Sequence, residues 1–400
     1  MKKRFYIPLL AAAILFPSCK KKHEPDPPVA PSGVAMTTVV YAVNRSSLSS
    51  DFPTDLDEML RGLKKVADKS YRLLVYRTDS DTQCGLYEAV ADSNGDYQLQ
   101  LLKSYPRDVT STHPERMAKV LDDACSQYPD SRMNLFFWGH GTSWTPNFSG
   151  HQVKAPVRVE QPEAQSYGGE YNGEQGYGKP TDWIDIDDLA DAIPSGRFET
   201  IWFDCCYMAG IENAYQLRDK CDYLVAYPTE VWQEGLNYDV AFPYIMSPTP
   251  DLQGAAASLY DFYSKDNDAV TVTVMRMDRI EAVADAVKRI YAKGNQLADV
   301  KKVSNYARFS AGPFYDLSQY VAQVGEAYGV DAALLEQYRQ AMEEFVVYKA
   351  FTPYNFNNRT WTDPALSGVS THHYTGDTST STAAAREEYY RTLAWYQRVY

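Results

Sequence analysis

Two short apolar stretches, each ending in reactive side chains, constrain the fold of this chain most strongly. The first reads NLFFWGHG and reaches His140, and the second reads IWFDCC and reaches Cys206. Apolar runs of this length, followed at once by turn residues, are typical of strands buried on both faces of a parallel sheet. Ligands of open α/β sheets bind beyond the carboxyl ends of the strands. We therefore expect His140 and Cys206 to form one site on neighbouring strands.

A thiol and an imidazole at such a site suit nucleophilic attack on an amide. The thiolate is the reactive form of cysteine, and a nearby imidazole can take its proton and later pass it to the leaving amine. Gly141 follows the histidine, so its N–H can approach a substrate carbonyl and form an oxyanion hole with the N–H of Cys206. Taken singly, His140 and Cys206 could each be structural core residues. Their order, their strand ends and the following glycine favour a catalytic pair.

The same two motifs resemble those of the clostripain-like cysteine peptidases, which are relatives of caspases, legumains and gingipains. The segments FDCCYMAGIENAYQLRDKCDYLVAYPTEV, TTVVYAVNRSSLSS and ALSGVSTHHY extend the resemblance over roughly residues 38–375. It implies a cysteine endopeptidase with a caspase-like α/β/α sandwich, a mainly parallel central sheet and a smaller C-terminal subdomain. The family usually has Ala where this chain has Cys205, so two adjacent thiols compete. The Asp-x-Cys register favours Cys206 as the nucleophile.

A carboxylate, Asp204, stands at the end of the second apolar run, where burial without a partner is costly. The resemblance implies that Asp204 forms the floor of a pocket for the Arg or Lys side chain before the scissile bond, with Glu230 as a second wall. Glu234 could replace Glu230 in that role. The structural alternative for Asp204 is a cap on a helix that starts near Tyr207.

The stretch between Gly141 and Thr181 has no hydrophobic periodicity and is rich in Gly, Pro, Ser and polar residues. Long connections without secondary structure are uncommon inside compact domains and are usually functional or disordered. The resemblance implies that this loop borders the substrate cleft and is cut during activation. Lys154 is the first candidate for self-cleavage, and Arg158 is the second. The alternative is a mobile lid that is never cut.

The N-terminal sequence MKKRFYIPLLAAAILFPSC has a basic start, a short apolar core and a small residue before Cys19. This pattern predicts a secretory signal peptide over residues 1–18, too short to span a membrane. Its end resembles a bacterial lipoprotein signal, which implies that Cys19 is lipidated and anchors the protein in the cell envelope. Ordinary cleavage and release is the alternative. Residues 19–36 predict a Pro-rich tether, 37–275 the catalytic domain and 276–400 a C-terminal subdomain.

Composition and motifs limit the kinds of partner and cofactor that the protein can bind. The net charge of −13 argues against nucleic acid as the main partner. The chemistry requires no cofactor. Clostripain-type enzymes are often associated with calcium, but no EF-hand pattern occurs, so a calcium site would need scattered carboxylates. His372 and His373 are adjacent on an expected strand and would point to opposite faces of the sheet. We therefore do not expect them to bind the same metal ion. We expect a monomer acting on peptides or proteins.

Another class of function stays open on sequence alone. A non-catalytic surface lipoprotein with the same fold could bind peptides or glycans through the chain's 32 tyrosines. Export and tether fit both functions equally, whereas intact His140, Gly141 and Cys206 favour the peptidase.

The rest of the chain alternates strands with amphipathic helices, which predicts a parallel sheet with right-handed crossovers. One helix, capped by Thr112 with Pro114 and Glu115 in its first turn, leads directly into the His140 strand. Further strands are expected at 38–43, 71–77, 222–227 and 269–275, a hairpin at 85–104, and helices at 55–67, 112–129, 181–194, 254–264, 278–294, 329–348 and 383–400.

Overall fold

The described residues form a nine-stranded sheet, and its strand order places the two candidate strands side by side. The structure is a computed structural model that describes residues 33–66, 68–80, 82–145, 167–170, 182–307, 314–356 and 360–400. The strands of the sheet are β1 (Met36–Ala42), β2 (Tyr71–Thr78), β3 (Gln83–Ala91), β4 (Tyr97–Pro106), β5 (Arg132–Trp138), β9 (Phe198–Asp204), β10 (Cys221–Ala226), β11 (Thr271–Arg276) and β13 (Val346–Phe351). Their order is β13-β11-β10-β9-β5-β1-β2-β3-β4.

The centre of this sheet is parallel and its margins are antiparallel. Strands β10, β9, β5, β1 and β2 pair in parallel, while β3 and β4 on one side and β11 and β13 on the other pair antiparallel. Central strands such as β1 are buried along their whole length, which explains their continuous apolar sequences. The long edge strand β4 is largely exposed, and most of its exposed residues are polar.

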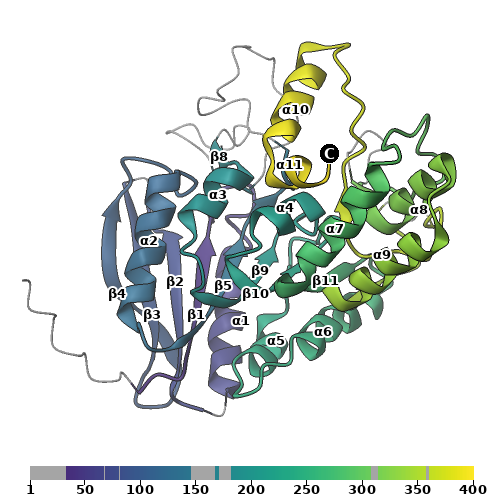
Figure 1. Cartoon of the computed structure of the whole chain (residues 1–400). Helices are drawn as coiled ribbons and strands as arrows, with labels where there is room; N and C mark the ends of the chain where they lie inside the picture. The colour runs from purple at the N-terminus through teal and green to yellow at the C-terminus, as the bar shows by residue number, and fades with distance from the viewer. Residues whose placement is uncertain are drawn as a thin grey trace, which may run out of the picture. The chain divides into compact units, whose positions relative to one another are not determined.

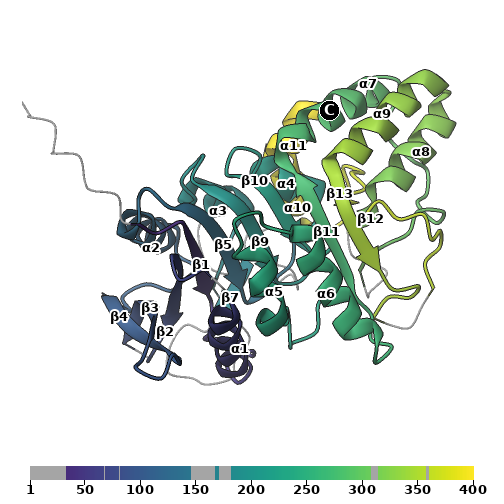
Figure 2. The same ribbon diagram turned by 90° about the horizontal axis from the view of Figure 1, so that it is seen from below.

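Helices cover both faces of the sheet, as the views in Figure 1 and Figure 2 show. One face carries α1 (Phe52–Lys65), α5 (Tyr238–Ile245) and α6 (Leu252–Ser264); the other carries α2 (Pro114–Gln127), α3 (Ile186–Ala192), α4 (Ile211–Gln216) and α7 (Ile280–Tyr291). This arrangement confirms the expected α/β/α sandwich.

Alternation along the central strands divides the core into two clusters, one on each face of the sheet. Phe136 of β5 stacks on Trp202 of β9, with ring centroids 5.7 Å apart, on the α1, α5 and α6 side. The next residues, Phe137 and Phe203, stack at 4.9 Å on the α2, α3 and α4 side. Each aromatic pair contributes about 1 kcal/mol beyond its buried area. Together they fix the register of β5 against β9, on which the site depends.

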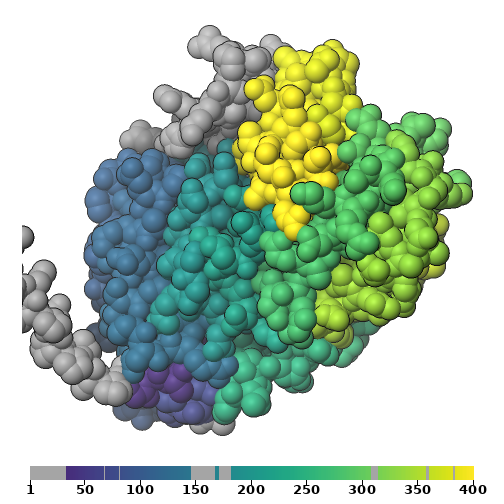
Figure 3. All heavy atoms as spheres, in the orientation of Figure 1, coloured from purple at the N-terminus to yellow at the C-terminus, as the bar shows by residue number. Residues whose placement is uncertain are grey.

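The C-terminal part continues the same sheet and core. It supplies η1 (Met277–Arg279), α8 (Leu317–Tyr328), α9 (Ala332–Phe345), β13, α10 (Ser381–Thr392) and α11 (Ala394–Val399), together with a two-stranded sheet of β12 (Tyr315–Asp316) and β14 (Ser370–Thr371). In Figure 3 its last residues, in yellow, cover the surface beside α4 and α7, which α11 contacts. The described residues form one compact unit. The division of the chain at residue 275 into a catalytic domain and a C-terminal subdomain stays a prediction.

Several local expectations were wrong. The helix before β5 begins at Pro114, and its N-cap is His113 rather than Thr112. The hydroxyl of Thr112 is bonded instead to the Thr110 hydroxyl at 3.0 Å, inside a buried group. The first residues of the segment 181–194 form a strand, β8 (Asp182–Ile184), before α3 begins.

Two helices in the C-terminal part also differ from expectation, one in its C-terminus and one in its continuity. The helix expected through residue 348 stops at Phe345, because Val346 and the β-branched and aromatic residues after it join the sheet as β13. The last helix is broken at Leu393 into α10 and α11. None of the helices in the described residues combines the length and apolar character that a bilayer crossing needs.

Candidate active site

His140 and Cys206 lie in adjacent turns at the carboxyl edge of the sheet. Strands β5 and β9 pair in parallel, and their last pair in register is Trp138 with Asp204. Each reactive residue follows two positions later, so the predicted adjacency of the two strands is confirmed. We call residues 139–145 the histidine turn and residues 205–210 the cysteine turn.

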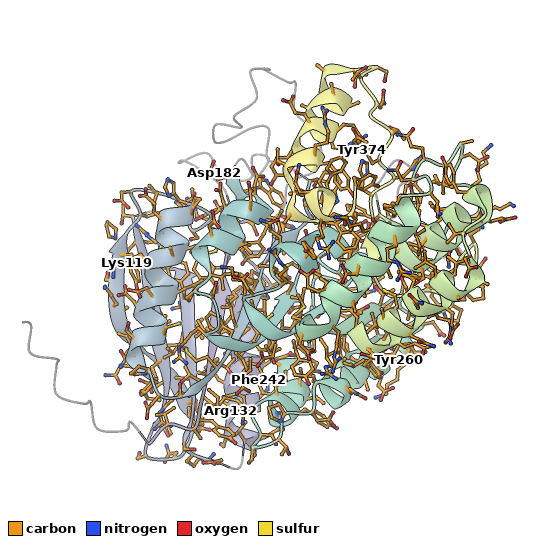
Figure 4. The ribbon with its side chains drawn as sticks, viewed as in Figure 1. Lys119, Arg132, Asp182, Phe242, Tyr260 and Tyr374 are labelled. Carbon is orange, nitrogen blue, oxygen red and sulfur yellow. The ribbon has the colours of Figure 1, made fainter. Side chains whose placement is uncertain are left out.

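Figure 4 orients this edge of the sheet. Arg132, the first residue of β5, lies at the lower edge, and Asp182 of β8 lies at the upper edge. The two turns are therefore at the upper end in that view.

The two turns touch at Gly141. A Cβ placed on Gly141 would lie 2.6 Å from the carbonyl oxygen of Cys206 and 3.1 Å from the sulfur of Cys205. No other residue fits without moving the cysteine turn. The glycine that the sequence assigned to an oxyanion hole is thus also required by the packing of backbone against backbone.

The two neighbouring thiols have different surroundings. Cys205 is 1% exposed and belongs to the core cluster on the α2, α3 and α4 side. Burial, then the nearby Cys206 and Asp204, raise the pKa of the Cys205 thiol well above its ordinary value. Cys206 is partly exposed, and its sulfur accepts a hydrogen bond from the N–H of Val231 at 3.4 Å. A buried thiol that holds its proton is a poor nucleophile, so these surroundings favour Cys206.

His140 is held by the segment that follows β1. Its Nε2 lies 2.8 Å from the hydroxyl of Ser47, and its ring centroid is 6.1 Å from that of Trp183. Burial lowers the pKa of His140 below its ordinary value. The neutral imidazole, which can accept a proton, is therefore favoured at neutral pH. Ser47 belongs to a segment that resembles the family, but nothing in the sequence indicates its contact with His140.

A second small sheet braces the histidine turn. It consists of β6 (His140–Gly141), β7 (Tyr167–Glu170) and β8, with His140 opposite Gly168 and Gly141 opposite Tyr167. The expectation of an unstructured stretch from 141 to 181 was therefore wrong over residues 167–170. Four residues with two glycines give no strand signal on their own.

Both ends of β7 are anchored in the protein interior. The Tyr167 hydroxyl lies 3.1 Å from the carbonyl oxygen of Trp138 and 3.0 Å from that of Tyr41, at the ends of two central strands. Glu170 is fully buried, pairs with Arg107 at 2.9 Å and accepts a bond from the N–H of Ser111. Burial raises the pKa of Glu170, and Arg107 opposes that rise. His140 therefore pairs with a strand that a buried ion pair anchors.

Asp204 is enclosed by internal donors. Its carboxylate accepts hydrogen bonds from the Tyr238 hydroxyl at 2.6 Å, the Tyr227 hydroxyl at 3.0 Å and the N–H of Leu236 at 3.1 Å. Burial raises its pKa, and these three donors oppose the rise. A Cβ on Gly235 would lie 2.6 Å from the carboxylate, so the chain passes directly over it. A substrate side chain reaches Asp204 only if residues 231–237 move.

The structure also corrects the alternative role for Asp204. The helix after Cys206 starts at Ile211 with Gly210 as its N-cap, so Asp204 caps no helix near Tyr207. Glu230 is partly buried and directly precedes Val231, whose backbone touches the Cys206 sulfur.

Three predicted residues lie outside the described part of the chain: Cys19, Lys154 and Arg158. Within the described ranges, no three His, Cys, Asp or Glu side chains lie together in a way that could hold a metal ion. His372 is buried and bonded to Glu387 at 2.8 Å.

An α/β sandwich with a cysteine and a histidine at adjacent strand ends defines a class of cysteine hydrolases. The model of the clostripain family matches residues 40–358, and the chain belongs to this family. The protein is therefore a cysteine endopeptidase that acts on peptides or proteins, and its chemistry requires no cofactor. Family membership favours the peptidase over the non-catalytic lipoprotein.

Solved structures of bacterial C11 proteases share the fold. A secreted C11 cysteine protease from Bacteroides thetaiotaomicron, in complex with an irreversible peptide inhibitor, is 24% identical, with a TM-score of 0.73 over 91% of this chain and 99% of its own. Iotapain from the same organism is 23% identical, with a TM-score of 0.76 over 93% and 100%. An inactive zymogen C11 protease from Parabacteroides distasonis is 22% identical, with a TM-score of 0.74 over 93% and 100%. No curated protein matches the chain.

Proposed function

We propose that Cys206 is the nucleophile of this endopeptidase and His140 its general base. The observation that carries this proposal is the register of β5 and β9, which ends in adjacent turns that bear the two side chains. His140 takes the thiol proton as the sulfur attacks the peptide carbonyl, and then gives it to the leaving amine. Water cleaves the resulting thioester, its proton passes to His140, and the thiol is restored.

The N–H groups of Gly141 and Cys206 form the oxyanion hole in this proposal. The close approach of Gly141 to the backbone of Cys206 supports it, because two donors from touching turns can converge on one oxygen.

We expect His140→Ala and Cys206→Ala each to lower kcat by about 10⁴-fold while the protein stays folded. Peptide hydrolysis and thermal melting measure this. Activity that survives both substitutions would refute the dyad.

We further propose a preference for Arg or Lys before the scissile bond, with Asp204 as the pocket floor and Glu230 as a wall. The position of Asp204 at the end of β9, two residues before Cys206, supports this assignment. The pocket opens in this proposal when residues 231–237 move off Asp204. Hydrolysis rates on matched peptides with Arg, Lys, Gln or Ala at that position test it. Equal rates on all four peptides would remove the assignment.

Processing and export complete the proposal. A relative from Parabacteroides distasonis is described as an inactive zymogen, and one from Bacteroides thetaiotaomicron as secreted. We infer that this protein is exported, anchored by lipid at Cys19, and cut at Lys154 or Arg158 on activation. A denaturing gel of active protein, with mass analysis of the fragments, tests the cut. A single full-length band in an active preparation excludes obligatory cleavage.

A further inference from the structure

The side-chain amide of Asn213 contacts both catalytic turns. Asn213 is in α4 and is fully buried. Its Nδ2 donates to the hydroxyl oxygen of Ser143, in the histidine turn, at 3.2 Å, and to the carbonyl oxygen of Met208, in the cysteine turn, also at 3.2 Å. The carbonyl of Met208 needs a donor, so the NH2 group rather than the amide oxygen must face it. One amide group therefore ties the two turns together.

Both turns contain a residue in an unfavourable backbone conformation. Ser143 has a φ of 66° and Tyr207 a φ of 63°, and these are two of the three non-glycine residues with left-handed φ in the described ranges. Such residues persist only where their surroundings hold them. The bonds from Asn213 reach Ser143 itself and Met208, the residue after Tyr207. The amide is thus placed to hold both strained positions.

The packing around the amide leaves little freedom. Ser143 is fully buried, and its hydroxyl oxygen would lie 2.9 Å from a Cβ on Gly210, the N-cap of α4. The two turns also touch at Gly141, which is nearer to the chemistry. Contacts at Gly141 and at Asn213 therefore hold the two turns against each other at two points.

We propose that Asn213 is a positioning residue that sets the distance between the imidazole of His140 and the sulfur of Cys206. The inference rests on the proposed dyad. It assigns Asn213 no contact with substrate: the amide acts through Ser143 and Met208. A misplacement of about 1 Å between reacting groups can cost about 100-fold in rate, so a bond that holds the two turns together has a kinetic effect.

The test compares Asn213→Ala, Ser143→Ala and the double variant in the full-length protein. We expect Asn213→Ala to lower kcat about 10- to 100-fold with little change in KM. Ser143→Ala removes one of the two bonds and should lower kcat less. The double variant should be no slower than Asn213→Ala, because both changes break the same link. Asn134→Ala is the matched control, since Asn134 is a buried amide of β5 that donates to the Met36 sulfur, away from both turns.

A second readout separates positioning from general loosening. The rate of Cys206 alkylation by iodoacetamide, followed against pH by mass spectrometry, reports how well the imidazole stabilises the thiolate. We expect the midpoint of this profile to rise in Asn213→Ala and to stay at the wild-type value in Asn134→Ala. Wild-type kcat and an unshifted profile in folded Asn213→Ala would overturn the inference, as would an equal loss of kcat in Asn134→Ala.

Two further outcomes keep the inference separate from the dyad. If Asn213→Ala does not fold, Ser143→Ala decides: reduced kcat supports the inference and unchanged kcat overturns it. If His140→Ala and Cys206→Ala keep activity, the dyad itself fails. If those two substitutions abolish activity while Asn213→Ala and Ser143→Ala change nothing, the dyad stands and only the inference falls.

Discussion

The histidine turn and the cysteine turn follow neighbouring strands of one sheet, but different parts of the chain hold them. In the cysteine turn, Tyr207 N–H donates to Thr229 O at 2.8 Å and Ala209 N–H to Tyr227 O at 3.1 Å. Both acceptors belong to the segment that directly follows β10, a strand of the main sheet. The histidine turn pairs instead with β7, a strand of four residues. A short strand outside the main sheet is the weaker support, so the position of His140 should be disturbed more easily than that of Cys206.

The largest expected effect separates the two thiols within the cysteine turn. We expect Cys206→Ala to lower kcat/KM by about 10⁴-fold or more, because the attacking sulfur is lost. Cys205→Ala removes a buried sulfur from the core, so it should lower the free energy of unfolding by about 1 kcal/mol and leave kcat nearly unchanged. Peptide hydrolysis and chemical denaturation of both variants measure this. The reverse pattern would make Cys205 the nucleophile.

A change in the anchor of β7 should reach the histidine turn alone. Glu170→Gln replaces the charge that faces Arg107 in a buried pair, so we expect the free energy of unfolding to fall by about 2–4 kcal/mol. We also expect kcat to fall about 10- to 100-fold as the base shifts. Hydrogen exchange should speed up at residues 139–145 and stay unchanged at 205–210. An equal increase in exchange rate in both turns would contradict the weaker support of the histidine turn.

A smaller effect on activity is expected from the loss of the Ser47 hydroxyl, which contacts His140. Ser47→Ala removes the partner of His140 Nε2, and because Ser47 is exposed, water can partly replace it. We expect kcat/KM to fall by up to about 10-fold, with stability unchanged within about 0.5 kcal/mol. Ser47→Thr keeps a hydroxyl and should restore the rate. Ser49 is a nearby exposed serine, so Ser49→Ala is the control. An equal loss of kcat/KM in Ser49→Ala would show that the effect of Ser47→Ala does not depend on its contact with His140.

The smallest expected effect is on the pH dependence of stability, and it comes from Asp55, which is bonded to the last residue of β5. Asp55 accepts a hydrogen bond from Trp138 Nε1 at 2.6 Å, and burial together with the charge of Asp204 raises its pKa from 3.8 to about 8. Between these values the unfolded chain loses a proton that the folded protein keeps, so Asp55 makes stability fall as pH rises.

Asp55→Asn removes this dependence and still accepts from Trp138. We expect Asp55→Asn to be more stable than the wild type at pH 8, by at least about 1 kcal/mol, with the difference shrinking toward pH 4. Denaturation at several pH values measures it. A constant difference across that range would exclude a raised pKa at Asp55.

The sequence predicts the features of this site that local patterns encode. Apolar runs ending at His140 and Cys206 suffice to predict two buried strands, their adjacency and the candidate dyad. The strand β7 escapes prediction because Tyr167–Glu170 has glycines at its centre and gains its stability from distant partners such as Arg107. Likewise α5 contains Pro243, a residue that usually argues against a helix interior.

The surroundings of Asp204 show the same limit. Its donors, Tyr227, Leu236 and Tyr238, are more than twenty residues away along the chain, and only the folded protein brings them to the carboxylate. Asn213 is similar: a lone amide in a short helix has no sequence signature, and its importance depends on which two turns it touches.

Mapping the thiol that reacts with a substrate-like electrophile is the most direct test of Cys206 as the nucleophile and His140 as its base. The wild type, Cys205→Ala, Cys206→Ala and His140→Ala would each be treated with a peptide that ends in Arg and carries a thiol-reactive group, and the labelled residue identified by mass spectrometry. We predict rapid labelling of Cys206 in the wild type and in Cys205→Ala, slow labelling of Cys206 in His140→Ala and no labelling in Cys206→Ala. Labelling of Cys205, or labelling of Cys206 at the same rate with and without His140, would contradict it.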